Sequence, residues 1–583
     1  MLTHRVKYLI TEYGVKPDDI LVITFTKAAA VEMQKRFEAL MDRKLPVTFG
    51  TFHSVFFRIL RQAYGYTVDN IIKDDYRRQL LTDAVNRCHM EVEDSGDFFH
   101  QLEGEISRVK GDGLDIEVYH STKFPAQEFK DVYRLYTDAL KRSGLLDFDD
   151  MLLMTRELLQ DRPDLLAAWQ RRYRYILIDE FQDINRIQYE VIRRLALPEN
   201  NLFIVGDDDQ SIYGFRGSRP ELMLNFKKDY PEAQEVILDA NFRSTAHIVT
   251  AAGQVIVHNG TRFAKKIHTT NEEGNPVDIV EFPDHTAQLD RIVQELRTLS
   301  GTMPLSEVAV LYRTNGIAEP LVRRLIEANI PFALREGVPN LFEHWIAKDF
   351  ISYMTLALGG RKRADFLRIA NKPVRYIGRD YLTEPEIDLV TLERYYDEKP
   401  WMAERVHKLA SDLKLMGGMN PYAAMNFLRK GVGYDDYLKQ YAEDHEIEAQ
   451  ELYDTAEEVM ESARGKRCIA DWFDYIGDYT RELRATNRRK GTENKEEAVT
   501  LTTMHSSKGL EYDTVFIMDA NEGICPHRKS VFPDQIEEER RMFYVAMTRA
   551  KKQLHIYYAR QKYNRKTQAS RFIGEIMEKP LKS

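Results

Sequence analysis

Two adjacent carboxylates follow a short apolar run in the first third of the chain. Residues Tyr175–Ile178 predict a buried strand, and Asp179 and Glu180 come directly after it. An aspartate there can hold a phosphate-bound Mg²⁺ directly or through water, while the glutamate can orient or deprotonate an attacking water. An isolated Asp-Glu pair is more often two solvated acids, but here Phe-Gln-Asp follows, which makes a much rarer string. The segment predicts phosphoryl chemistry, with Asp179 as the metal ligand and Glu180 as the group that activates water.

A second segment with chemical potential covers residues 205–218, where an apolar strand end leads into Gly-Asp-Asp-Asp-Gln. The amide of Gln210 can hydrogen-bond a terminal phosphate. Tyr213, Phe215 and Arg216 offer flat faces on which unpaired bases can stack, each worth about 1–3 kcal/mol. Any one of these side chains alone would more often belong to a core. Their occurrence together behind this turn favours nucleic-acid binding.

The elements that must position these residues alternate between short β-branched runs and long helical patterns, which is typical of an α/β fold. Each expected strand ends in polar residues, Gly or Asp/Thr, where α/β proteins place ligand chemistry. The expected buried parallel strands are 20–25, Tyr175–Ile178, 202–205, Val308–Tyr312 and 515–518.

Two stretches depart from this alternation. Residues 61–170 and 380–494 are helical in pattern and rich in charge. A chain of 583 residues suggests roughly four structural units at about 150 residues each. We therefore expect two α/β cores, each interrupted by a helical insertion.

Composition excludes several classes of protein. With 43% hydrophobic and 30% charged residues, the chain is neither collagenous, disordered nor a coiled coil. Its three cysteines rule out a four-thiolate metal site and make a disulfide framework improbable. The charged N-terminus does not match a signal peptide, and the sequence lacks an apolar run of the roughly 20 residues that a membrane span needs. We expect a cytoplasmic protein without a membrane partner.

The net charge of −9 argues weakly against nucleic acid, but charge is unevenly distributed. Residues 435–461 hold eleven acids and one basic residue, which we interpret as a solvated helical face rather than a partner site. Residues 549–571 hold eight basic residues and no acid.

Nine segments in a fixed order resemble the motifs of superfamily 1A helicases of the UvrD/Rep/PcrA type, nearly from end to end. Such an ordered set could not plausibly arise by chance. The segments are motif Ia at 23–33, Ib at 50–54, the stretch before motif II at 145–152, the Asp-Glu-Phe-Gln-Asp of motif II, the Gly-Asp-Asp-Asp-Gln of motif III, motif IV at 238–245, IVa at 308–315, V at 501–517 and VI at 537–552.

The resemblance implies a fold and domain boundaries. It predicts two RecA-like parallel-sheet cores, named 1A and 2A, with helical insertions 1B and 2B. We place 1A at residues 1–62 and 168–255, 1B at 63–167, 2A at 256–379 and 495–583, and 2B at 380–494. The second insertion is short for this family.

The resemblance also implies nucleotide-binding residues. Arg243 and Arg549 match the two arginines that sense phosphate, one on each core, and a guanidinium there can stabilise charge on a transferring phosphoryl group. Phe242 matches an aromatic that stacks on adenine. Gly509 and Glu511 match a nucleotide-binding segment whose carboxylate meets the ribose. The alternative for Arg549 is membership of the basic C-terminal run.

For DNA, the resemblance adds residues from three further motifs to Tyr213, Phe215 and Arg216. A lone histidine such as His505 is more often a satisfied core residue, so its assignment depends on the match. The added residues are Phe25, Thr26 and Lys27 of motif Ia, Thr51 and His53 of motif Ib, and His505 of motif V.

One family feature is absent from the 583 residues. The family carries a phosphate loop ending in Gly-Lys-Thr just before the segment that matches residues 2–10, and an adenine-reading glutamine upstream of it. Here Met1 stands where the following helix has begun, and the only Gly-Lys pair is Gly465-Lys466, which Arg467 follows. We expect a truncated or mis-started reading frame whose parent is active.

The expected function is an ATP- and Mg²⁺-dependent helicase and translocase. It would move 3′ to 5′ on single-stranded DNA and on 3′-tailed duplex DNA, in repair, replication or recombination, with repair or replication proteins as partners. The alternative is an inactive pseudo-helicase that binds single-stranded DNA or a repair partner. An exonuclease-helicase subunit is disfavoured, because the residues after Arg571 do not resemble a nuclease and the three cysteines cannot supply its usual cluster.

Overall fold

The computed structural model describes residues 1–88, 90, 95–121, 124–214, 217–379, 382–445, 447–488, 497–563 and 565–578. The chain forms two compact units. The first comprises Met1–Asp239, Ile256–Lys266 and Phe532–Tyr544, and the second comprises Ala240–Val255, Ile267–Val531 and Val545–Ser583. Each unit is built around a parallel sheet, so the predicted α/β class with two parallel-sheet cores is confirmed. The finer division into 1A, 1B, 2A and 2B stays a prediction.

The first unit contains a four-stranded parallel sheet in the order β2-β1-β3-β4. Its strands are β1 (Ile20–Thr24), β2 (Thr48–Thr51), β3 (Tyr175–Ile178) and β4 (Leu202–Ile204). The strands β1, β3 and β4 were all expected from the sequence, and their ends agree to within one residue. Strand β2 was missed, because its four residues hold a glycine and two threonines instead of an apolar run.

Both faces of this sheet are buried, which explains why its inner strands are apolar throughout. Ile20 and Val22 of β1 belong to a hydrophobic cluster with α1 and α2, whereas Leu21 and Ile23 belong to a cluster with α3, α7, α8 and α9. Alternate residues thus serve opposite faces. The helices of the sheet region are α1 (Leu2–Thr11), α2 (Lys27–Met41), α3 (Phe52–Tyr64), α7 (Phe148–Asp161), α8 (Pro163–Arg172), α9 (Arg186–Ala196), α10 (Pro220–Leu224) and α11 (Phe226–Asp229).

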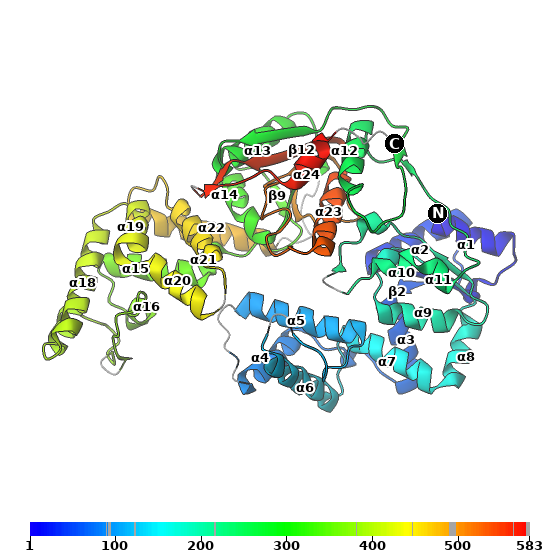
Figure 1. Ribbon diagram of the computed structural model, residues 1–583, viewed down its shortest axis with the longest axis horizontal. Helices are drawn as coiled ribbons and strands as arrows, with labels where there is room; N and C mark the ends of the chain where they lie inside the picture. Colours follow the sequence, from blue (N-terminus) through cyan, green and yellow to red (C-terminus); the bar gives the residue numbers. More distant parts are fainter. Residues whose placement is uncertain are drawn as a thin grey trace. The chain divides into compact units, whose positions relative to one another are not determined.

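A group of three helices interrupts the first unit: α4 (Asp74–Arg87), α5 (Ser95–Asp112) and α6 (Ala126–Ser143) (Figure 1). It has a hydrophobic cluster of its own, centred on residues such as Leu102, Phe129 and Tyr136. The described part of residues 61–170 holds helices and a single β-bridge, between Ile71 and Leu146, but no strand. The predicted helical character of this stretch is confirmed.

The second unit contains a six-stranded parallel sheet in the order β7-β12-β11-β8-β10-β9. Of these strands only β8 and β11 were expected, and β11 begins three residues before the expected start. The strands are β7 (Asp278–Phe282), β8 (Val308–Tyr312), β9 (Phe332–Leu334), β10 (Val499–Thr503), β11 (Tyr512–Ile517) and β12 (Ala550–Ala559).

Shorter elements complete this part of the chain. Two small sheets pair β5 (Ala240–Asn241) with β6 (His268–Thr269) and β13 (Gln561–Lys562) with β14 (Arg565–Lys566). The helices are α12 (Ala246–Ile256), α13 (His285–Ser300), α14 (Glu319–Glu327), α23 (Pro533–Met547) and α24 (Arg571–Met577). Helix α23 starts in the first unit and ends in the second.

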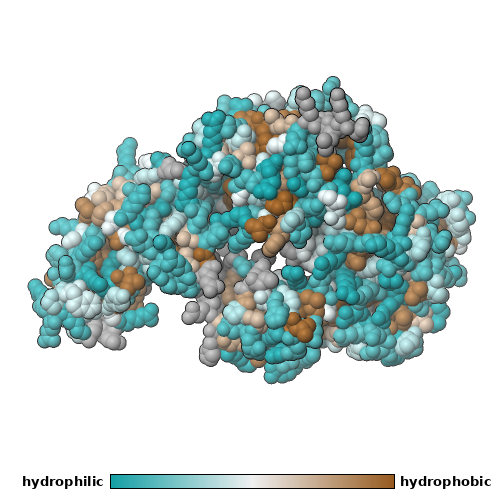
Figure 2. Space-filling model, in the orientation of Figure 1, coloured by the Kyte–Doolittle hydropathy of each residue, from teal (hydrophilic) through white to brown (hydrophobic). Residues whose placement is uncertain are grey.

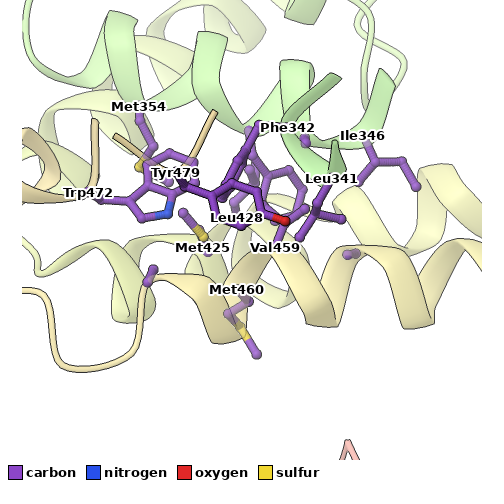
Figure 3. Close-up of a cluster of buried hydrophobic side chains, with 14 of the residues drawn as sticks. Leu341, Phe342, Ile346, Met354, Met425, Leu428, Val459, Met460, Trp472 and Tyr479 are labelled. Carbon is purple, nitrogen blue, oxygen red and sulfur yellow. The ribbon is translucent and has the colours of Figure 1, made fainter. Parts of the chain in front are cut away.

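In the described part of residues 345–488, the second unit has a helical insertion, most of whose helices are labelled in Figure 1. Its core combines aliphatic, methionine and aromatic side chains (Figure 3), and Phe342 meets Trp472 and Tyr479 edge to face, at ring-centroid distances of 6.1 and 5.7 Å. This cluster is continuous with the core of the six-stranded sheet. The helices are α15 (Trp345–Ala357), α16 (Arg363–Ile369), α17 (Leu389–Tyr395), α18 (Pro400–Gly417), α19 (Pro421–Phe427), α20 (Tyr434–Asp444), α21 (Ala449–Ser462) and α22 (Ile469–Arg488).

The acidic run of residues 435–461 forms α20 and most of α21. Our interpretation of this run as a solvated face is wrong for Glu457 and Glu458 of α21, because the Glu457 side chain is only 12% exposed beside Arg429 and Glu458 Oε1 accepts the hydroxyl of Tyr563 over 2.7 Å. The more exposed Glu448 and Asp454 pair with Arg528 and Arg565 over 3.3 and 3.0 Å. The acids pair with basic residues that follow much later in the sequence, so the local pattern could not show the contact.

Among the described residues, no helix combines the length and the apolar character needed to span a membrane. The face of the molecule seen in Figure 2 is mostly hydrophilic, with hydrophobic patches of limited size.

Candidate active site

The carboxyl edge of the first sheet gathers several of the predicted segments. Asp179 follows β3, and its N–H donates to the carbonyl of Ile23 in β1 over 2.9 Å. The N–H of Phe181 donates to the carbonyl of Val205, just beyond β4, also over 2.9 Å. Motif II is thereby held between motif Ia and motif III, at the edge where parallel α/β sheets bind their ligands.

Glu180, the predicted water-activating residue, has a left-handed backbone with φ of 53°. A non-glycine residue there costs about 1–3 kcal/mol and persists only where its surroundings fix it. Gln182 is one such support: it is fully buried, and its Nε2 donates to Glu180 Oε2 over 2.6 Å. Its Oε1 accepts the N–H of Asp207 over 3.0 Å. One side chain therefore holds both motif II and motif III.

The three consecutive aspartates of motif III are held by two cations. Their oxygens lie within 4.8 Å of one another. Lys265 Nζ lies 2.6 Å from Asp208 Oδ1 and also pairs with Asp207, while Arg262 donates bonds of 2.8 and 2.6 Å to Asp209. Burial alone would raise the pKa of Asp207, but the ammonium of Lys265 holds that pKa below its ordinary value. Because two cations of the same chain pair with these three carboxylates, we assign the cluster a bracing role and keep Asp179 as the candidate metal ligand.

The turn after motif III carries Gln210 and Tyr213. Gln210 Nε2 donates to Asp207 Oδ2 over 2.6 Å. Helix α23 fastens the rest of the turn: Arg541 Nε donates to the carbonyl of Ser211 over 2.9 Å, and Glu538 Oε1 accepts the N–H of Gly214 over 2.8 Å. The motif III turn is therefore held on both sides.

The aromatic residues of motifs Ia and III meet at this edge. The rings of Phe25 and Tyr213 stack, with centroids 5.2 Å apart and planes inclined by 14°. Thr26 caps α2 by accepting the N–H of Ala29 over 3.1 Å, and Lys27 opens the helix with an exposed side chain. Phe215 and Arg216, the other predicted stacking residues, lie outside the described residues.

Motif Ib lies at the end of β2. Thr51 Oγ1 accepts the N–H of Ser54 over 3.3 Å, and Ser54 Oγ accepts the N–H of Thr51 over 2.8 Å, which closes a capping box at the start of α3. His53 packs edge to face on Phe148 at 5.4 Å, and burial lowers the pKa of its imidazole. His53 is therefore a half-buried, mainly neutral side chain beside the motif Ib cap.

The candidate arginines occupy the amino edge of the second sheet. Arg243 Nε donates to Glu511 Oε2 over 2.7 Å, directly before β11. The hydrogen bond from Arg243 lowers the pKa of the Glu511 carboxyl. The neighbouring Ser244 donates its Oγ–H to the carbonyl of Ala550, the first residue of β12, over 2.6 Å. These contacts fix motif IV on the second sheet.

Arg549 comes directly before β12 and is only 1% exposed. Its Nη1 donates to the carbonyl of Leu510 over 3.2 Å and its Nε to that of Val545 over 2.9 Å. Arg243 and Arg549 thus meet adjacent residues of motif V within one unit. The expectation that the arginines lie on separate cores is wrong, because β5 pairs with β6 and Ser244 hydrogen-bonds to β12, both in the second unit.

The remaining candidates of the second unit lie at two different places. Phe242 is 77% exposed beside Arg243, and Gly509 has a φ of 81°, which favours glycine. His505 follows β10 and so lies at the carboxyl edge, opposite the arginines. There Thr503 Oγ1 donates to Glu336 Oε2 over 2.9 Å and supports the motif V turn.

A separate cavity of about 510 Å³ lies in the second unit. Charged side chains of α13, α14 and α21 line it, among them Arg323 and Glu458. The residues that line it include none of the predicted site residues, so it is distinct from both groups described above.

Comparison with known proteins decides the family. The chain matches the UvrD/REP helicase N-terminal domain over residues 1–231 and the UvrD-like helicase C-terminal domain over residues 236–561. It is 32% identical over 626 residues to the ATP-dependent DNA helicase PcrA of Leuconostoc citreum, covering 100% of this chain and 82% of that protein. DNA helicase II of Haemophilus influenzae is 32% identical over 612 residues, with 99% and 83% covered.

The chain belongs to the UvrD/Rep helicase family. The resemblance read from the ordered motifs is thereby confirmed, and this UvrD/Rep protein is a helicase. Its two family matches meet between residues 231 and 236, close to residue 239, where the chain leaves the first unit for the second.

Three polar residues of this UvrD/Rep site were missed from the sequence. Gln182 stands inside motif II, so only its role was overlooked. Arg262 and Lys265 come from a short basic segment that follows α12, and this local excess of positive charge was the available signal. Their partners lie 53 to 58 residues earlier, so no local pattern could pair them.

Proposed function

We propose that this helicase is ATP-dependent, moves 3′ to 5′ on single-stranded DNA and opens 3′-tailed duplexes. One observation carries the proposal: Asp179, Glu180 and Gln210 share one sheet edge with the stacked rings of Phe25 and Tyr213. Carboxylates and an amide suited to a nucleotide phosphate thus lie beside flat aromatic faces suited to a base. The relatives named ATP-dependent DNA helicase PcrA and DNA helicase II support the ATP dependence and the action on DNA.

Mg²⁺-ATP fits the chemistry of the residues at this edge. Asp179, half-buried at the end of a parallel strand, offers the hard oxygen ligand that Mg²⁺ prefers. When bound, Mg²⁺ would neutralise charge on the phosphate oxygens. Glu180 would orient the attacking water and Gln210 would hydrogen-bond the terminal phosphate.

In the second unit, Arg243 and Arg549 would bind phosphate oxygens, Phe242 would stack on adenine, and Gly509 and Glu511 would contact the sugar side of the nucleotide. In the structure both guanidiniums are engaged, Arg243 by Glu511 and Arg549 by backbone carbonyls. A phosphate would have to compete with these partners, so we propose that nucleotide binding rearranges the motif V segment.

For DNA, we propose that an unpaired base inserts at the Phe25–Tyr213 pair, with Phe215 and Arg216 as further stacking faces. Thr26, Lys27, Thr51 and His53 would contact the strand from motifs Ia and Ib, and His505 from motif V. The cellular role would be repair, replication or recombination of DNA, with repair or replication proteins as partners.

The first test measures ATP hydrolysis by the full chain with and without single-stranded DNA. We expect DNA-stimulated turnover that EDTA abolishes, and a loss of about a thousandfold in Glu180→Gln, since a residue that activates water acts in the transition state. Glu199→Gln, an exposed acid of the same unit, is the matched control and should leave turnover unchanged.

The alternative expected from the sequence stays a second candidate. It is a protein that binds single-stranded DNA without hydrolysing ATP. DNA binding together with turnover that does not respond to Glu180→Gln would favour this second candidate. DNA-stimulated turnover that Glu180→Gln abolishes would exclude it.

A further inference from the structure

The side chain of Gln182 bridges the two motifs that face the proposed nucleotide. Its Nε2 donates to the carboxylate of Glu180 over 2.6 Å, and its Oε1 accepts the backbone N–H of Asp207 over 3.0 Å. The amide can have only this orientation, because a carboxylate accepts and a backbone N–H donates. The backbone carbonyl of Gln182 accepts the hydroxyl of Ser211 over 3.2 Å. Gln182 thus contacts motif III at two points.

The bridge is enclosed and tightly fitted. Gln182 is fully buried, and a Cβ placed on Gly206 would come within 2.5 Å of its Oε1. Only glycine at 206 lets the motif III backbone approach the amide this closely. A buried amide group left without a hydrogen-bond partner destabilises the folded state. The bonds from Gln182 to Glu180 and to Asp207 therefore support each other, because losing one would leave part of the buried amide unpaired.

Asp207 continues the bridge toward Gln210. The Oδ2 atom of Asp207 accepts from Gln210 Nε2 over 2.6 Å, while Lys265 binds its other oxygen. An unbroken series of hydrogen bonds therefore runs from Glu180 through Gln182 and Asp207 to Gln210. The two ends are the proposed water-activating carboxylate and the proposed phosphate-sensing amide.

We propose that Gln182 is a positioning residue that couples these two ends, so that Glu180 is correctly oriented only when Gln210 is in place. The expected effect on ATP hydrolysis rests on the proposed function, whereas the hydrogen-bonded bridge between Glu180 and Asp207 does not. Gln182 touches neither substrate nor metal and acts through Glu180. The left-handed backbone of Glu180 persists only because its surroundings support it. A change in motif III that disturbs Gln182 would therefore also change the position of the Glu180 carboxylate.

Three substitutions separate the parts of the bridge. Gln182→Met is close to the glutamine in size and removes both bonds. Gln182→Glu keeps an acceptor for the Asp207 N–H but places a second carboxylate against Glu180 instead of a donor. Gln188→Met is the matched control: Gln188 is also buried, and its Oε1 accepts the N–H of Asn185 over 3.0 Å, away from motif III.

Steady-state ATP hydrolysis gives the first readout. We expect Gln182→Met and Gln182→Glu to lower kcat by about 10- to 100-fold with little change in KM for ATP, because a misplaced catalytic group lowers turnover more than binding. The control Gln188→Met should keep the wild-type kcat even if it is less stable.

A double-mutant cycle gives the readout that a merely structural role would not change. If Gln182 acts through the series that ends at Gln210, the double variant Gln182→Met/Gln210→Met should be no slower than the slower single variant. Independent effects would instead multiply. Multiplied effects, or a folded Gln182→Met that keeps kcat within about twofold of the wild type, would overturn the proposal.

Hydrogen exchange tests the bridge without any need for hydrolysis. In Gln182→Met the peptide that contains the Asp207 N–H should exchange at least about tenfold faster, and Gln182→Glu should restore its protection. A wild-type protein without ATPase activity would overturn the proposed function, and exchange alone would then decide on the bridge. Unchanged protection of this peptide in Gln182→Met would overturn the proposed bridge, and faster exchange confined to motif III would support the bridge.

Discussion

At the scale of single residues, the ammonium of Lys265 pairs with three aspartates at once. Its ammonium lies 2.6 Å from Asp208 Oδ1 and 3.1 Å from Asp209 Oδ2, and it also pairs with Asp207. The side chain is only 10% exposed. Without Lys265, Arg262 would be the one cation of these two left beside the three aspartates. Removing one partner of a buried ion pair destabilises a protein by more than the intact pair stabilises it.

We therefore expect Lys265→Met to lower the free energy of unfolding by about 3 kcal/mol at pH 7. The loss should shrink on acidification. The folded-state pKa of Asp207 lies below its ordinary value, so its contribution is present above the unfolded pKa and disappears as pH falls through the folded one.

Urea unfolding of the wild type, Lys265→Met and the exposed neighbour Lys266→Met, at pH 7 and pH 3, measures both effects. A deficit of equal size at both pH values would show that the charge on the aspartates is not the cause.

Residues with local signals were the predictable part of the site. Asp179 and Glu180 stand directly after an apolar strand, so their place at a sheet edge follows from the sequence. Lys265 depends on partners 57 and 58 residues away, and Ser244 on a carbonyl 306 residues away. Contacts of that separation follow from the packing of whole elements, which no local pattern encodes.

At the scale of elements, α5 and α7 are joined by buried charges. Lys110 of α5, only 1% exposed, donates to Asp147 over 2.7 Å and to Asp150 over 2.6 Å in the first turn of α7. Asp149 of the same turn accepts the hydroxyl of Ser107 over 2.6 Å. One lysine thus faces several carboxylates, and burial together with the charge of Asp147 raises the pKa of Asp149 to about 6.

Asp149→Asn should therefore stabilise the protein at pH 8 and not at pH 4. Folding raises the pKa of this carboxyl from about 3.9 to about 6, so the folded state is favoured while the group is protonated and loses stability as pH rises through that window. An amide carries no such penalty.

Thermal unfolding at the two pH values checks this, with Asp161→Asn on the exposed end of α7 as the control. An equal shift in Tm at both pH values would rule out the titration of Asp149 as the cause.

The strands also show what the sequence can and cannot predict at this scale. Strands β3 and β8 are short apolar runs and were predicted with their correct ends. Strand β12 begins Ala-Lys-Lys-Gln, so its start lacks the continuous apolar run by which a buried strand is recognised. Strand β9 is apolar but has only three residues, which is shorter than the runs of about 4–8 that indicate a strand. Both are specified by the neighbours they pair with.

At the scale of the whole molecule, charge distribution matters more than net charge. The chain carries 83 basic and 92 acidic side chains, which alone would suggest a poor nucleic-acid partner. Several acids of the run 435–461 are paired with basic residues of the core, including Arg528 and Arg565. The net charge of −9 therefore says little about the surface near motifs Ia and III.

The order of motifs predicted the architecture at this scale, and the family matches over 1–231 and 236–561 agree with it. The end of core 1A at residue 255, which we placed by that order, is not where the first unit ends, because residues 240–255 lie in the second unit. The segment belongs to the second unit because β5, Arg243 and Ser244 all bind there. A motif's position along the chain does not fix the core it joins.

The most direct test of the central claim is strand displacement by the full chain on two duplexes that differ only in the polarity of a single-stranded tail. We expect ATP- and Mg²⁺-dependent displacement from the 3′-tailed duplex and about tenfold less from the 5′-tailed one, as translocation from 3′ to 5′ requires. Displacement that needs no ATP, or that favours the 5′-tailed duplex, would contradict the account.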